Sequence, residues 1–177
     1  MHWHVEHEET RLLLERYIAV LALPTDRLRV TTERREFATW LGREVRASIG
    51  GAYAFKPSTR EHLVFIHLAR IDLSQPKSLE VVVAEELIHM RDRLDGDLRR
   101  HARHGYDRIA RRVAAVTGAS LEEVRAAVIP PKRRPARFVY ACASCGLEVP
   151  RRTTGTWSCG RCSPHFDARY LLRLVSA

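Results

Sequence analysis

Apolar residues along the chain change from helical to extended spacing and back again. Residues 6–23 carry apolar side chains three and four positions apart, which predicts an amphipathic helix that stops at Pro24. Between residues 27 and 70 the spacing shortens, which predicts three strands and one short helix. The strands are expected over 28–31, 45–55 and 63–68, and the helix over 33–41.

Helical spacing returns after residue 76 and continues until two consecutive prolines, Pro130 and Pro131, end it. The strongest helix is expected over 77–94, with Gly96 closing it. A second is expected to begin near His104 and to stop at Gly118, and a capping box at 120–123 begins a third. This order of elements predicts an α+β domain over 1–129, a basic linker over 130–137 and a small β module over 138–177.

Charge is distributed unevenly along the chain. It has 30 Lys and Arg against 21 Asp and Glu, and residues 130–177 hold nine of the basic residues but only two acidic ones. This excess predicts a polyanionic partner for the last quarter of the chain, although a general bias towards arginine is the alternative explanation. No apolar run approaches the ~20 residues of a membrane helix and no signal peptide is evident, so a cytoplasmic location is expected.

The helix expected over 77–94 combines burial with ionisable residues. Apolar residues cover nearly every direction around its axis between 79 and 90, yet Glu85, Glu86 and His89 lie in the same stretch. A buried carboxylate is costly unless it is paired, protonated or bound to metal. A cation held by Glu85 and His89 beside Glu86 would satisfy this requirement, and pairing with Arg91 or Arg93 is the alternative.

A third candidate ligand follows fifteen residues after His89. His104 comes after the predicted helix stop, so the chain has room to turn back and bring a third nitrogen to the pair. Metallopeptidases commonly use H-E-x-x-H with a distant third ligand, and here the segment reads Glu85-Glu86-Leu87-Ile88-His89.

With these motifs, residues from about 34 to 173 resemble the SprT-like (Spartan-like) zinc metallopeptidase family. Members typically carry H-E-L-I-H, then H-G-x-x-F, and often a C-terminal zinc ribbon, in the order seen here at 85–89, 104–107 and 142–162. The resemblance implies a zincin-like fold, in which a small sheet packs on helices and the helix over 77–94 carries the active site. It also implies peptidase activity on DNA-associated proteins such as DNA–protein crosslinks.

The resemblance assigns roles to four residues. Glu85, His89 and His104 would hold zinc or another divalent metal, and Glu86 would take a proton from water and pass it to the leaving amine. Two positions depart from the family pattern, because Glu85 stands in place of the first histidine and Asp107 in place of an aromatic residue. A carboxylate ligand weakens the pull of the metal on water and shifts metal preference towards harder ions.

All four cysteines of the chain occur in two C-x-x-C pairs separated by thirteen residues. Two such pairs predict a structural zinc site, and a dithiol redox pair or two disulfides are the alternatives. The segment has few large apolar side chains, so the metal is expected to supply much of its core. The predicted ligands are Cys142, Cys145, Cys159 and Cys162.

The basic ribbon is expected to bind DNA, single-stranded or distorted, through phosphate contacts and an aromatic face. The predicted contact residues are Lys132, Arg133, Arg134, Arg137, Arg151, Arg152 and Trp157. Two alternatives to a DNA-directed peptidase remain open. One is a catalytically silent nucleic-acid-binding protein, because of Glu85, and the other is a metallopeptidase unrelated to DNA.

Overall fold

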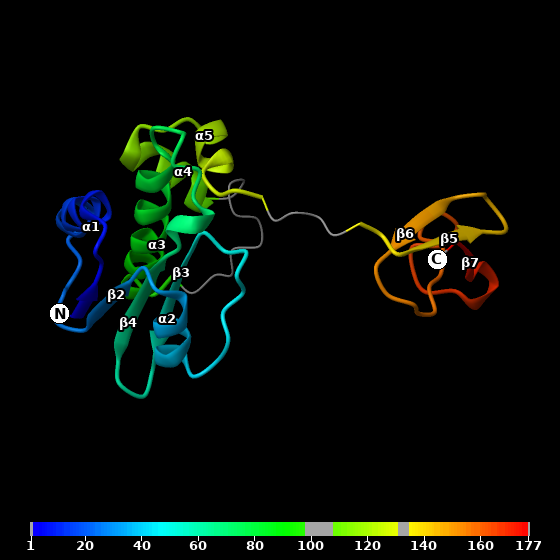
Figure 1. Cartoon of the computed structure of the whole chain (residues 1–177), viewed down its shortest axis with the longest axis horizontal. Coiled ribbons are helices and arrows are strands. Elements are labelled where there is room, and N and C mark those ends of the chain that lie inside the picture. The colour runs from blue at the N-terminus through cyan, green and yellow to red at the C-terminus, as the bar shows by residue number, and fades with distance from the viewer. Residues whose placement is uncertain (1, 98–107, 131–134, 177) are drawn as a thin grey trace. The chain divides into compact units, whose positions relative to one another are not determined.

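The chain divides into two compact units, Met1–Pro130 and Pro131–Ala177. The computed structural model describes residues 2–97, 108–130 and 135–176 (Figure 1). The division falls at Pro130, beside the segment 130–137 that the sequence predicts to be a linker.

A four-stranded mixed sheet forms the centre of the first unit, with the strand order β1-β2-β4-β3. β2 pairs in parallel with both β1 and β4, whereas β3 pairs antiparallel with β4 and forms one edge of the sheet. The strands are β1 (His2–His4), β2 (Leu28–Thr31), β3 (Gly51–Lys56) and β4 (Glu61–Ile66).

Helices cover both faces of this sheet (Figure 1). The side chains of β2 and β4 that point to one face, such as Val30 and Val64, pack with α1 (Glu8–Val20) and α3 (Ser78–Leu94) in the main core. On the other face, Phe37 and Trp40 of α2 (Arg34–Leu41) pack on Leu63 and Phe65 of β4. The near-continuous apolar run of β4 therefore reflects burial on both faces.

The longest helix, α3, lies in the middle of the core. Side chains on almost every side of it are buried, as the apolar residues around its axis predict: Leu79, Val81, Val82, Val83, Ala84, Leu87, Ile88 and Met90. Its ionisable residues therefore occupy an apolar environment.

Two shorter helices, α4 (Arg108–Thr117) and α5 (Leu121–Ala126), follow it. Asp92 of α3 is buried and accepts ion pairs from Arg108, at 2.9 Å, and from Arg112. Arg108 also pairs with Asp97 at 2.7 Å, so the first turn of α4 is fixed to the last turns of α3. Ser120 and Glu123 form the predicted capping box at the start of α5.

The second unit is a three-stranded antiparallel sheet with the order β6-β5-β7. Its core contains Tyr140, Leu172 and the sulfur atoms of Cys142 and Cys159, a small apolar set for an independent fold. The elements are β5 (Phe138–Cys142), β6 (Glu148–Arg151), a short 3-10 helix (Ala168–Tyr170) and β7 (Leu172–Ser176).

The α+β class predicted from the sequence is confirmed, but the strands differ from the expected ones in three places. The strand expected over 63–68 is β4, which begins at Glu61 and ends at Ile66, because His67 leads into a short 3-10 helix, Leu68–Arg70. The strand expected over 45–55 begins only at Gly51, because Val45 instead packs with α2 on the outer face of the sheet. The strand His2–His4 lacks a distinctive sequence pattern and depends on pairing with β2. No helix in the described part of the chain has the length and apolar character that crossing a bilayer requires.

Candidate functional site

One stripe of α3 brings the predicted site residues to the start of β3. Val82, Glu85, Glu86 and His89 are spaced three and four positions apart, so they follow one face of the helix. Glu85 and His89 are half-buried, and Glu86 is buried, with 6% of its surface exposed. The helix thus carries two carboxyl groups and an imidazole on one face, next to the edge strand β3.

Close approach between α3 and β3 depends on Gly51. A Cβ atom at this position would lie 2.6 Å from Oε1 of Glu86 and 3.0 Å from a methyl group of Val82. The backbone N–H of Tyr53, two residues along β3, donates a hydrogen bond to the Glu86 carboxyl. The sheet edge therefore both makes room for the side chain of Glu86 and fixes its orientation.

A cavity of about 230 Å³ opens beside these carboxyl groups. Its walls come from the segment that leads into β3, from α3 and from the chain after α5: Ser48, Ile49, Gly50, Gly51, Val82, Glu85, Glu86 and Val128. A space of this size accommodates several water molecules or the side chain of a peptide.

Burial and the nearby charge of Glu85 raise the pKa of Glu86 well above its ordinary value, and the hydrogen bond from Tyr53 only partly offsets this. A carboxyl group with a raised pKa in a cleft is typical of residues that transfer protons at neutral pH. Glu86 is therefore the candidate general base of this site.

The two arginines considered as partners for these carboxylates have other contacts. Arg91 pairs with Asp95 one turn further along α3, at 2.5 Å. The guanidinium of Arg93 lies over the ring of Phe55, 4.4 Å from its centroid. His104, the predicted third ligand, lies outside the described residues.

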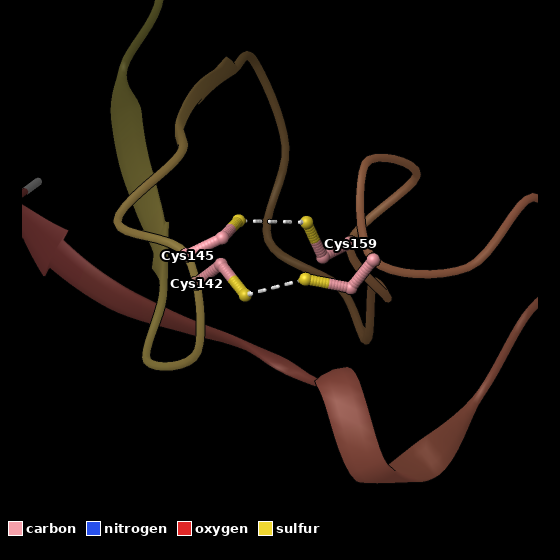
Figure 2. Close-up of side chains that lie close together, drawn as sticks. Cys142, Cys145 and Cys159 are labelled. Atoms are coloured by element: carbon pink, nitrogen blue, oxygen red, sulfur yellow. Dashed lines mark hydrogen bonds between the residues drawn. The ribbon is translucent and has the colours of Figure 1, made fainter.

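The four cysteines of the second unit form the clearest candidate metal centre. Their sulfur atoms all lie within 4.8 Å of one another, and Figure 2 shows Cys145 facing Cys159 across the cluster. The Sγ–Sγ distances are 3.6 Å for Cys145 and Cys159, and 3.8 Å for Cys142 and Cys162. Elsewhere in the described ranges, no group of three or more His, Cys, Asp or Glu side chains is close enough to hold an ion.

These distances fit a tetrahedral ion. Zinc–sulfur bonds of about 2.3 Å place the sulfur atoms of a regular tetrahedron about 3.8 Å apart. All four cysteines are free thiols, and each close pair joins one C-x-x-C motif to the other. This geometry favours a shared metal over two disulfides or a redox dithiol within one motif.

Backbone turns at each C-x-x-C motif direct the sulfur atoms inward. Gly146 has a left-handed φ of +68°, and its N–H donates to the carbonyl of Cys142 at 2.9 Å. At the second motif, the N–H groups of Cys162 and Ser163 both donate to the carbonyl of Cys159. Gly160, within the second motif, does not adopt a left-handed φ, so this turn does not depend on one.

The cluster also perturbs the acidity of its thiols. Burial raises the pKa of Cys159, but the N–H groups of Cys162 and Arg161 and the neighbouring thiols lower it to about 7 overall. The hydrogen bond with Cys145, followed by burial, raises the pKa of Cys162 to about 12. One thiolate forms readily, whereas a bound cation is needed to deprotonate the whole set.

Among the described members of the predicted DNA-binding set, Arg137, Arg151 and Arg152 lie near the end of the second sheet where Phe138 pairs with Arg151. Arg137 and Arg152 are exposed, and the N–H of Arg137 donates to the carbonyl of Arg151 at 2.9 Å. The guanidinium of Arg151 lies over the half-buried ring of Trp157, 4.6 Å from its centroid. Lys132, Arg133 and Arg134 lie outside the described residues.

Comparisons with protein-family models, with curated proteins and with solved structures gave no match for this chain. Its function is therefore argued from its own residues.

Sequence reasoning missed the contribution of the sheet edge to the site. Gly50 and Gly51 are adjacent in the sequence, and the structure places Gly51 against Glu86 and Gly50 against Val128. Paired glycines at the start of a strand were the available signal, since they often mark a close approach of another element. Nothing in the sequence pattern identified Val128 or the N–H of Tyr53.

We expect zinc to bind the second unit with one ion per chain and to support its fold. Cys159→Ser should abolish this binding and unfold the unit, because serine is a poor zinc ligand and the sulfur atoms belong to the core. Element analysis and Trp157 fluorescence measure the two effects. Ser144→Ala, an exposed change within the first motif, should leave both unchanged.

The raised pKa of Glu86 predicts a specific pH dependence of stability. The folded state retains this proton more tightly than the unfolded chain, so the free energy of unfolding should fall as pH rises from about 4.5 through the raised pKa. Glu86→Gln removes the titrating group and should remove this fall. Urea denaturation from pH 4.5 to 8 without added divalent metal measures the difference between the two proteins, and a pH-independent difference would contradict the shift.

Proposed function

We propose that the chain is a metal-dependent peptidase resembling the SprT-like family, acting in the cytoplasm on proteins associated with DNA. The observation that carries this proposal is the buried Glu86 carboxyl with its raised pKa, which lines a cavity together with Glu85. A purely structural helix gains nothing from a buried carboxyl group such as that of Glu86, because burying it is costly.

The edge strand beside this cavity suits an extended peptide. β3 pairs with β4 on one side only, so peptide groups along its other side lack a strand partner within the described sheet. An extended substrate can add to such an edge through main-chain hydrogen bonds. A peptide bound along Gly51–Lys56 would pass over the stripe of α3 that carries Glu86.

Within this proposal, Glu86 takes a proton from a water molecule in the cavity and passes it to the departing amine. The hydrogen bond from Tyr53 holds its carboxyl group in one orientation for both transfers. A divalent metal at Glu85, His89 and His104 would supply Lewis-acid polarisation of the substrate carbonyl and of water.

The anchoring of α4 supports His104 as the third ligand. Arg108, four residues after His104, pairs with Asp92, and Asp92 follows His89 by three residues on α3. The start of α4, four residues after the predicted ligand in the sequence, is thus held beside the turn of α3 that follows His89.

The second unit supplies the proposed contact with DNA. Its exposed arginines Arg137, Arg152, Arg161 and Arg173 have no carboxylate partner among the described residues. Arg137 and Arg152 lie at the end of the sheet that follows the Lys132–Arg134 segment in the chain. Unpaired cations of this density favour a phosphate backbone over a neutral partner.

A second candidate function is a nucleic-acid-binding protein without catalysis. It is favoured by the arrangement of possible metal ligands, because the four-cysteine cluster is the single complete ligand set among the described residues. The number of metal ions per chain distinguishes the two functions, because the peptidase requires a second ion.

We expect Glu86→Gln to lower DNA-stimulated cleavage of a DNA-bound protein at least 100-fold, since a general base typically contributes that much. The metal content should stay at two ions per chain, because glutamine preserves the shape of the side chain and spares the ligands. Glu122→Gln, an exposed change on α5, should retain full activity. Full activity in the Glu86 variant would remove Glu86 as the base, and one ion per chain in the wild type would favour the silent binder.

Binding to single-stranded DNA should depend strongly on salt and on the linker cations. Replacing Lys132, Arg133 and Arg134 together by glutamine should reduce the slope of log affinity against log salt by about 2, because each lost phosphate contact on single strands contributes about 0.7. Fluorescence anisotropy over a range of salt concentrations measures this slope. Arg111→Gln, an exposed arginine of α4, should leave it unchanged, and an unaltered slope in the triple variant would exclude the linker as a DNA contact.

A further inference from the structure

A larger cavity lies at the other end of β3, away from Gly51. It has a volume of about 420 Å³ and forms where the β3–β4 turn, the loop before β2 and the last turn of α3 meet. Its described lining consists of Pro24, Asp26, Arg27, Phe55, Arg60, His62, Arg93 and Leu94. Neither the candidate metal centres nor the proposed peptidase chemistry uses these side chains.

Three guanidinium groups converge on this cavity with little compensating charge. Arg60 and Arg93 have no carboxylate within 4.0 Å among the described residues, and Arg27 contacts only its neighbour Asp26, at 3.7 Å. Asp26 is the single acidic residue of the described lining. The negative end of the α3 dipole is also present, but it amounts to a fraction of one charge. The cavity therefore retains a clear excess of positive charge.

Arg93 is held in place by an aromatic ring. Its guanidinium lies 4.4 Å from the centroid of Phe55, whose own ring packs against His62 at 5.1 Å. Stacking on one face leaves the N–H groups at the edge of the guanidinium plane available to an acceptor. The arginine is thus oriented without its hydrogen-bonding capacity being used.

His62 adds a neutral donor to the same wall. Burial, followed by the charge of Arg93, lowers its pKa, and Nδ1 lies 2.9 Å from the hydroxyl of Tyr53. Burial raises the pKa of Tyr53, so its hydroxyl stays protonated and can donate to Nδ1. The imidazole proton then resides on Nε2, which becomes a hydrogen-bond donor.

We propose that this cavity is a binding site for a phosphate group, held by Arg27, Arg60 and Arg93 with His62 as an additional donor. An excess of two or more positive charges matches a phosphate better than a singly charged carboxylate, and guanidinium groups form paired hydrogen bonds with phosphate oxygens. The group belongs either to a nucleic-acid backbone or to a small phosphorylated molecule. This site is independent of the proposed peptidase activity.

A titration of the full-length protein with inorganic phosphate, at constant ionic strength in a phosphate-free buffer, tests the site. Amide resonances of Arg27, Arg60 and His62 should shift in a saturable manner. The double variant Arg27→Gln/Arg60→Asn should weaken binding at least tenfold without loss of fold, because both residues are exposed. Asparagine is chosen because Arg60 has a φ of +56°, a conformation that asparagine tolerates well.

Arg111→Gln is the matched control, since it also removes an exposed arginine from the first unit, and it should bind phosphate as the wild type does. A shift that never saturates, equal affinity in the double variant, or acetate binding as tightly as phosphate would each overturn the proposal. Competition by a single-stranded oligonucleotide, lost in the double variant, would identify a nucleic-acid backbone as the source. Saturable phosphate binding without such competition would identify a small phosphorylated molecule.

Discussion

The first unit is organised around one costly feature, a carboxyl group placed inside the core helix. Burying Glu86 on α3 costs several kcal/mol unless the group is protonated or compensated. The fold accommodates it by bringing a glycine and a backbone N–H of β3 against it. Substitution of this carboxyl group by an apolar residue of similar size would be expected to stabilise the unit, so its presence points to a role other than packing.

The second unit depends on a different interaction, because it has too few large apolar side chains to fold by hydrophobic burial alone. Two of its four most buried residues are the cysteines Cys142 and Cys159. A metal bound by the four sulfur atoms of the two turns would supply the missing cohesion. With a metal at its centre, the unit would not need its surface side chains to form a core. The surface can therefore carry arginines.

Helices were predicted well because their signals are local. The spacing of apolar residues placed α3 to within one residue, and the capping box placed the start of α5. The four-cysteine cluster was predicted equally well, because the spacing of the two C-x-x-C motifs is a local feature of the sequence. Two features depend on residues that are distant in the chain: the pairing of His2–His4 with β2, and the contact of Gly51 with Glu86. The spacing of apolar residues does not predict such long-range contacts. The arginine-lined cavity was missed for the same reason, because Arg27, Arg60 and Arg93 come from three separate segments.

Glu85 connects the two tasks of the proposed peptidase site, which are metal binding and proton transfer by Glu86. Its charge contributes to the raised pKa of Glu86, so in the absence of a cation the neighbouring carboxyl group tends to keep its proton. A cation bound to Glu85 would neutralise that charge and lower the pKa of Glu86 towards the range in which a carboxylate can accept a proton. A histidine at position 85 would not raise the pKa of Glu86 in this way, because a neutral imidazole has no negative charge. Under the proposed function, the departure from the usual metallopeptidase motif therefore makes the base depend on the metal more strongly than it would with histidine at this position.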